Sequence, residues 1–158
     1  MFRELIRKNK KISMEECLSL LKNQKRGILS VNGDDGYPYG MPMNHYYNEE
    51  DGKIYFHSGR GGHRADALRR NDKVSFCVHD EGYCLPGEWA LHVKSVIVFG
   101  RIKLLDDPAL VAEIATKLSH KFTNDDGYIQ SEIEQHAHRT QLLVLTPEHI
   151  CGKWVEES

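Results

Sequence analysis

The sequence has no long hydrophobic segment. No apolar run among its 158 residues approaches the ~20 that a helix needs to cross a bilayer. The first six residues, MFRELI, also lack the pattern of a secretory signal peptide. We therefore expect a cytoplasmic protein that is not inserted in a membrane.

The sequence also lacks an excess of one charge. It has 21 Lys and Arg against 23 Asp and Glu, which gives a formal net charge of −2. Nucleic-acid binding usually requires a clustered basic excess. We expect no nucleic-acid partner.

Cysteine motifs and metal-binding spacings are missing. The four cysteines are far apart and form no C-x-x-C, which argues against a zinc knuckle and a redox dithiol. His136 and His138 are the closest histidine pair, and an i, i+2 pair on a helix points to different faces. Ser58 and Ser75 lack a His/Asp framework for a catalytic triad. We therefore predict no metal site and no catalytic side chain.

The segment from Lys53 to His79 is the most informative part of the sequence. Residues 53–57 read as a strand, a loop with Gly59, Gly61 and Gly62 follows, residues 63–70 read as a short helix, and residues 73–78 as a second strand. A glycine loop that enters a helix with Arg64 near its start is a plausible phosphate site, because the helix N-terminus and the guanidinium both favour an anion. An ordinary strand–turn–helix connection remains an alternative. The spacing matches neither the Walker loop nor the dinucleotide fingerprint.

The remaining pattern predicts one domain of the α+β class, mainly β. Ser13 and Glu16 form a capping box before a helix that ends near residue 23. A second helix begins after Asp106-Asp107-Pro108, and residues 131–139 suggest a third. Strands are expected at 27–31, 37–47, 53–57, 73–78, 89–105, 142–145 and 149–155. Residues 1–11 are expected to be loosely ordered, and the domain spans 1–158.

Two of these strands carry signals of their own. Pro38 and Pro42 cannot donate to a β-ladder, so they mark an edge or a bulge in the strand 37–47. Gly100 is expected to be a bulge where a barrel bends. With the helices at the ends and edges, the pattern favours an antiparallel barrel over a parallel βαβ sheet.

The residues Tyr55-Phe56-His57-Ser58, Gly62-His63-Arg64, Leu68, Asn71 and the strand 73–78 resemble a known family. They are similar to the flavin-phosphate segment of the pyridoxamine 5'-phosphate oxidase-like split barrels, which bind flavin mononucleotide (FMN), and most of all to the nitroimidazole-resistance (Nim)-type flavoproteins. The resemblance covers residues from about 11 to 154. It implies an antiparallel split β-barrel with peripheral helices.

The resemblance also implies a set of cofactor-binding residues. His63 and Arg64 would hold the FMN phosphate, with Ser58 beside them. The ring would be lined by the strand that carries Met41, Met43, Asn44 and His45, and by Phe56 and His57. His92, Ser95 and Trp154 would reach the flavin across the interface of a homodimer.

The function implied is that of a flavin-dependent reductase. Electrons would come from NAD(P)H or another donor and pass to a small acceptor such as a 5-nitroimidazole. True pyridoxamine phosphate oxidases carry a C-terminal Arg-x-His element, which this chain lacks at Gly152-Lys153-Trp154-Val155, so vitamin B6 oxidation is disfavoured. Two alternatives remain open: a flavin- or haem-binding barrel without turnover, and a barrel that only binds a partner.

Overall fold

Residues 1–157, which the computed structural model describes, form a seven-stranded antiparallel sheet that curls into a half-barrel. The strands lie in the order β2-β1-β5-β6-β7-β4-β3. Their bounds are β1 (Arg26–Asn32), β2 (Pro38–Asn44), β3 (Tyr46–Asn48), β4 (Lys53–Gly59), β5 (Lys73–His79), β6 (Leu91–Leu105) and β7 (Thr140–Glu157). The mainly-β antiparallel fold expected from the sequence is confirmed.

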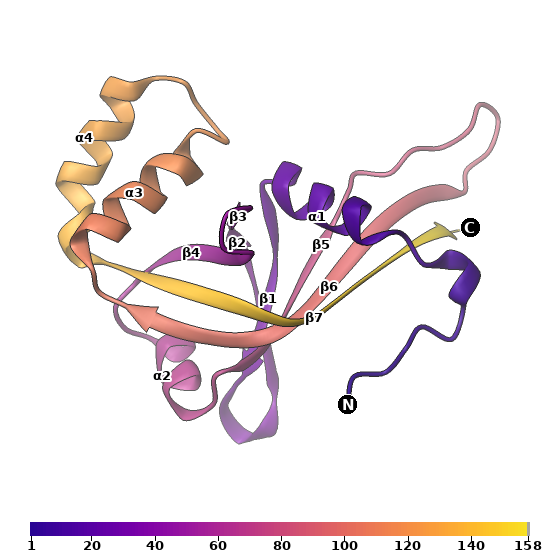
Figure 1. The fold of residues 1–158 in the computed structure, drawn as a ribbon, viewed down its shortest axis with the longest axis horizontal. Coiled ribbons are helices and arrows are strands. Elements are labelled where there is room, and N and C mark those ends of the chain that lie inside the picture. The colour runs from indigo at the N-terminus through magenta and orange to yellow at the C-terminus, as the bar shows by residue number, and fades with distance from the viewer. Residues whose placement is uncertain (158) are drawn as a thin grey trace.

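The long strands β6 and β7 are paired in the middle of the sheet. They lie side by side through its centre (Figure 1), and their pairing runs from Leu91–Glu157 to Leu105–Leu142. The register shifts between Phe99 and Gly100, where a side chain would collide with the carbonyl oxygen of Thr146. The irregularity predicted at Gly100 is therefore present, but the extra residue of the bulge is Glu148 of β7, opposite the step from Phe99 to Gly100.

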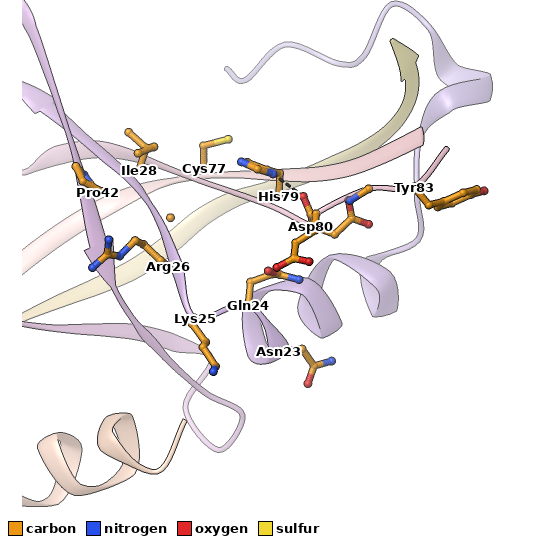
Figure 2. A pocket seen from close by; sticks show the side chains of 13 residues that line it. Asn23, Gln24, Lys25, Arg26, Ile28, Pro42, Cys77, His79, Asp80 and Tyr83 are labelled. Carbon is orange, nitrogen blue, oxygen red and sulfur yellow. Dashed lines mark hydrogen bonds between the residues drawn. The ribbon is translucent and has the colours of Figure 1, made fainter. Parts of the chain in front are cut away.

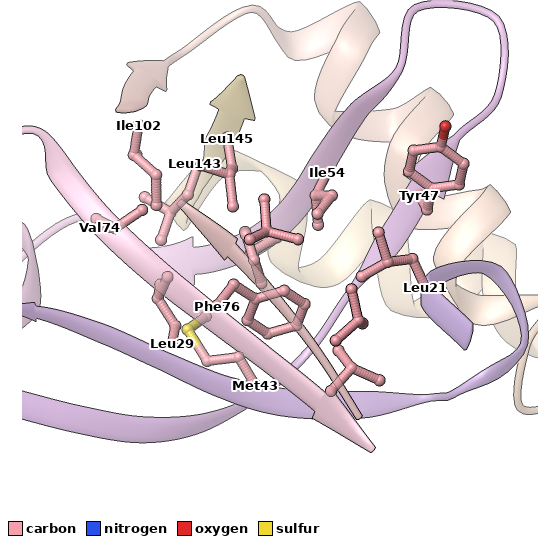
Figure 3. Close-up of a cluster of buried hydrophobic side chains, with 14 of the residues drawn as sticks. Leu21, Leu29, Met43, Tyr47, Ile54, Val74, Phe76, Ile102, Leu143 and Leu145 are labelled. Carbon is pink, nitrogen blue, oxygen red and sulfur yellow. The ribbon is translucent and has the colours of Figure 1, made fainter. Parts of the chain in front are cut away.

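The core lies inside the curl and follows the two-residue period of the strands. Phe56 and Phe76, both fully buried, meet edge to face with ring centroids 4.9 Å apart. Around them Figure 3 shows side chains from several strands and from the first helix, among them Met43, Leu143 and Leu21. This packing, rather than any loop, fixes the positions of β2 and β4.

The predicted strand 37–47 is two strands. β2 ends at Asn44 and β3 begins at Tyr46, because the chain turns at His45, whose side chain is fully buried. β2 lies at one edge of the sheet, as its prolines predicted. The two predicted C-terminal strands are instead one continuous strand, β7, which passes through Pro147.

Four α-helices surround the sheet in residues 1–157: α1 (Met14–Asn23), α2 (His63–Arg70), α3 (Pro108–Ser119) and α4 (Asp126–His136). The Ser13–Glu16 capping box and the Asp107 N-cap are present as predicted. α4 begins five residues before the predicted helix at 131, because the Asp125 side chain caps the Tyr128 amide. α3 and α4 pack together at one end of the sheet (Figure 1).

The N-terminal segment, expected to be loosely ordered, contacts the sheet. The ring of Phe2 stacks on His149 at 4.9 Å, Lys10 lies 3.4 Å from the centre of the Trp154 ring, and Lys11 forms a β-bridge with Lys153. None of the helices in residues 1–157 is long and apolar enough to span a membrane.

Candidate functional site

Arg64, in the first turn of α2, is a cation without an acidic partner. Its Nη2 donates to the Ser58 hydroxyl, and its Nη1 lies 3.7 and 3.8 Å from the sulfur atoms of Met41 and Met43. Its Nε is buried without a hydrogen-bond partner, and no carboxylate of residues 1–157 pairs with the guanidinium. Desolvation lowers the pKa of Arg64. A half-buried guanidinium with free donors is suited to binding an anion.

The N-terminus of α2 reinforces this preference. Gly62 precedes the helix with φ of 98°, a conformation that other residues rarely adopt, and no side chain caps the helix there. The first amides of α2 are therefore free to donate to a ligand, and the helix dipole favours a negative charge at this end. The glycine loop and Arg64 thus lie together where the sequence pattern predicts an anion site.

His63 adjoins Arg64 and is fixed by the turn between β1 and β2. Its ring stacks on Tyr39 with centroids 4.2 Å apart, and its Nε2 lies 3.3 Å from the backbone nitrogen of Asp34. Sequence reasoning proposed His63 as a site residue but missed its contacts with Tyr39 and Asp34. The only signal for them was the turn composition of residues 32–36, which gives no indication of what the turn contacts.

Asn44 and His57 line one cavity of about 540 Å³ between the sheet and the α3–α4 pair. The helix side of this cavity is largely apolar and aromatic, with Leu118, Phe122 and Tyr128 among its residues. Desolvation, and then the nearby charge of Arg64, lower the pKa of His57. His57 is therefore neutral near pH 7 and can donate or accept a hydrogen bond there.

Four other predicted residues point into the core. Met41 and Met43 are buried with only their sulfur atoms beside Arg64, and the Phe56 ring is fully buried. The His45 ring is also fully buried, and its Nε2 lies 2.7 Å from the carbonyl oxygen of Leu21. Strand alternation and the corner at residue 45 turn the side chains of His45 and Phe56 inward, so any contact of these two residues with a ligand would be through the backbone.

The residues expected to act across a dimer lie apart from Arg64. His92 and Trp154 line a separate cavity of about 520 Å³, in which the His92 ring stacks on Tyr83 at 4.8 Å. Ser95 lies on β6 opposite Lys153 of β7. Within one chain these three residues do not join the site around Arg64.

A third cavity, of about 780 Å³, was not anticipated from the sequence (Figure 2). It lies between the end of α1, the start of β1 and the end of β5, and is lined by both charges, including Lys25, Arg26 and Asp80. Arg26, which lines this cavity, donates from its Nε to the Oδ1 of Asn44 at 3.0 Å, and Asn44 lines the cavity of about 540 Å³ described above. Asn44 is thus held between two hollows of the surface.

A family model described as pyridoxamine 5'-phosphate oxidase matches residues 13–154, which is most of the sequence. The chain belongs to this family of split barrels. The resemblance seen in the sequence to flavin-binding members of the pyridoxamine 5'-phosphate oxidase family is thereby confirmed. Comparison with curated proteins finds none that matches.

Solved structures share the fold of this pyridoxamine 5'-phosphate oxidase family member at low sequence identity. A candidate 5-nitroimidazole antibiotic resistance protein from Bacteroides thetaiotaomicron has a TM-score of 0.75 and 18% identity, over 92% of this chain and 87% of its own. A conserved hypothetical protein from Mycobacterium tuberculosis reaches 0.80 at 16% identity, over 95% and 90%. An FAD-binding protein from Mesorhizobium loti reaches 0.70 at 24% identity, over 92% and 97%.

Proposed function

We propose that the protein is an FMN-dependent oxidoreductase that passes electrons from NAD(P)H, or another donor, to a small acceptor such as a nitroaromatic compound. The observation that carries this proposal is the unpaired guanidinium of Arg64 at the N-terminus of α2. Membership of a flavin-binding family makes a flavin phosphate the natural anion for it. The proposed site of action is the cytoplasm.

The residues around Arg64 fit the phosphate of FMN. The buried Nε has no partner, the Ser58 hydroxyl lies beside the guanidinium, and the first amides of α2 are uncapped. Phosphate offers several acceptor oxygens and a charge that would compensate the desolvated cation. Below the guanidinium, Met41 and Met43 provide a polarisable apolar floor that offers no competing charge.

The isoalloxazine ring, when bound, supplies the electron-transfer chemistry, and the protein supplies position and access. In this proposal Asn44 and His57 face the ring from the cavity of about 540 Å³, and the rest of that cavity admits the acceptor. Its apolar and aromatic helix side suits a planar, uncharged compound. Neutral His57 would orient a polar group of the acceptor through one hydrogen bond without adding charge.

A homodimer is part of the proposal. The outer face of the sheet exposes Ile28, Ile97 and Phe99, and Ile28 and Ile97 are aligned in register on either side of Cys77. A row of apolar side chains on an open sheet face is typical of an interface. A partner seated there would bring its own His92, Ser95 and Trp154 toward the site.

The test is an anaerobic absorption spectrum of the purified protein before and after addition of NADPH. We expect flavin bands that bleach with NADPH and return when a 5-nitroimidazole is added. Flavin bands that do not bleach with any nicotinamide would indicate a flavin-binding barrel without this turnover, and a Soret band would indicate haem. A protein that is colourless and does not bind added FMN would refute the proposal.

A further inference from the structure

The turn between β1 and β2, residues 33–37, packs directly on the first residue of α2. The backbone N–H of Asp34 donates to His63 Nε2 at 3.3 Å, and Tyr39, just after the turn, stacks on the same ring at 4.2 Å. The approach is close enough that a Cβ at Gly33 would lie 2.7 Å from the Tyr37 carbonyl oxygen and 3.3 Å from His63 Nε2. The turn therefore fixes the orientation of the His63 ring.

This contact also determines which nitrogen of His63 carries a proton. A ring nitrogen that accepts from a backbone N–H has no proton of its own, so the neutral ring carries its proton on Nδ1. The Asp34 carboxylate is farther from Nε2, at 3.6 Å, which exceeds a normal hydrogen bond. His63 thus has a free Nδ1–H donor next to Arg64.

The turn also brings a negative charge close to the proposed phosphate site. The Asp34 carboxylate would repel a bound phosphate, but Arg70, the last residue of α2, lies with Nη2 2.6 Å from Asp34 Oδ1. The two side chains are 62% and 53% exposed. An ion pair this exposed contributes little to folding stability. What the pair does determine is the position of the Asp34 carboxylate.

We propose that the β1–β2 turn is the positioning element of the phosphate site, and that Arg70 acts by holding the Asp34 carboxylate away from the anion. The inference rests on the proposed function, because it assumes that a phosphate binds at His63 and Arg64. Arg70 is a positioning residue, since its guanidinium is engaged by Asp34. The Asp34 backbone orients the His63 donor, and the ion pair with Arg70 keeps the Asp34 carboxylate from turning toward His63 and the anion.

The test is the dissociation constant of FMN for the wild type, Arg70→Met, Asp34→Asn and the double variant, at an ionic strength of about 0.15 M, where salt screens the long-range attraction between Arg70 and the phosphate. Lys73→Met is the matched control, because it removes the same charge from an exposed position just beyond α2, and Lys73 forms no ion pair in residues 1–157. We expect Arg70→Met to raise the constant about threefold to fivefold, the range of an exposed charge effect. Asp34→Asn keeps the backbone bond to His63, so its constant should be equal to or below that of the wild type.

The double variant decides the question. If Arg70 acts through Asp34, Arg70→Met should have no effect once Asp34 is Asn, and Lys73→Met should have little effect in either background. An equal loss from Arg70→Met in both backgrounds would mean direct attraction of the phosphate and would overturn the inference, as would unchanged binding by Arg70→Met. Failure of the wild type to bind FMN would overturn the proposed function as well, which distinguishes the two failures.

Discussion

At the scale of single residues, Arg64 combines two properties that rarely occur together. It is partly desolvated, and its neighbours in residues 1–157 are a hydroxyl and two thioethers in place of a carboxylate. A desolvated cation without an anion is unfavourable in the free protein. The free energy recovered when an anion binds should therefore be large.

Replacing Arg64 with Ala should weaken FMN binding by about 1.5–3 kcal/mol, the usual contribution of a charge-assisted hydrogen bond. This corresponds to roughly a 10- to 150-fold increase in the dissociation constant, measured by quenching of flavin fluorescence. Arg69→Ala is the control, since Arg69 contacts Asp66 and the Arg60 carbonyl. Unchanged affinity in Arg64→Ala would remove this residue from the site.

His45 should make folding stability fall in mild acid. Desolvation lowers its pKa to about 4 in the folded protein, so between that value and the unfolded value near 6.5 the unfolded chain binds more protons. Stability is therefore fully present above pH 6.5 and is lost toward pH 4, by up to about 3 kcal/mol. Urea unfolding at pH 7 and pH 4.5 measures the loss. His45→Gln should show a smaller difference between the two pH values, and an equal difference would contradict this origin.

At the scale of elements, the α3–α4 pair is held to the barrel by Lys121, just beyond α3. Its Nζ donates to the carbonyl oxygens of Gln24 and His45, at 2.6 and 2.7 Å. These acceptors lie before β1 and between β2 and β3. One side chain thus joins the segment after α3 to the chain on either side of the β1–β2 hairpin.

Lys121→Met should destabilise the fold by about 1–3 kcal/mol, because it leaves buried carbonyl groups without donors. Desolvation lowers the pKa of Lys121 to about 8, below its unfolded value near 10.5. The unfolded chain binds more protons between these two pH values. The contribution of Lys121 to the free energy of unfolding therefore rises from pH 8 to 10.5, and it is lost as pH falls through 8. Chemical denaturation of both proteins across this range isolates the effect. Parallel pH profiles would contradict it.

How far the sequence predicts these elements depends on whether the signal is local. The prolines of β2, the irregularity at Gly100 and the caps of α1 and α3 act within a few residues, and each prediction was confirmed. The break at His45 and the continuity of β7 through Pro147 depend on distant partners, and both were missed. The site divides in the same way: Arg64 follows from a local motif, whereas Tyr39 reaches His63 only through the folded sheet.

At the scale of the whole molecule, one face of the sheet lies over the core and the other is open. Strand alternation places Leu29, Phe76 and Val98 inside, so their neighbours Ile28, Cys77 and Ile97 line the outer face. Ile28 and Ile97 are 44% and 38% exposed in the single chain. Apolar side chains at these outward positions are expected where a second surface covers them.

Ile97→Glu should therefore convert a dimer to a monomer, because it would bury an unpaired carboxylate on each side of a twofold interface. Sedimentation velocity of wild type and variant at equal concentration measures the change. Met14→Glu is the control: Met14 is 52% exposed at the start of α1, where an acidic side chain is favourable. A monomeric wild type would refute the homodimer, and a dimeric Ile97→Glu would place the interface elsewhere.

If the partner also completes the flavin site, the monomeric variant should bind FMN more weakly. Its unfolding midpoint, measured by circular dichroism, should still be that of a folded barrel.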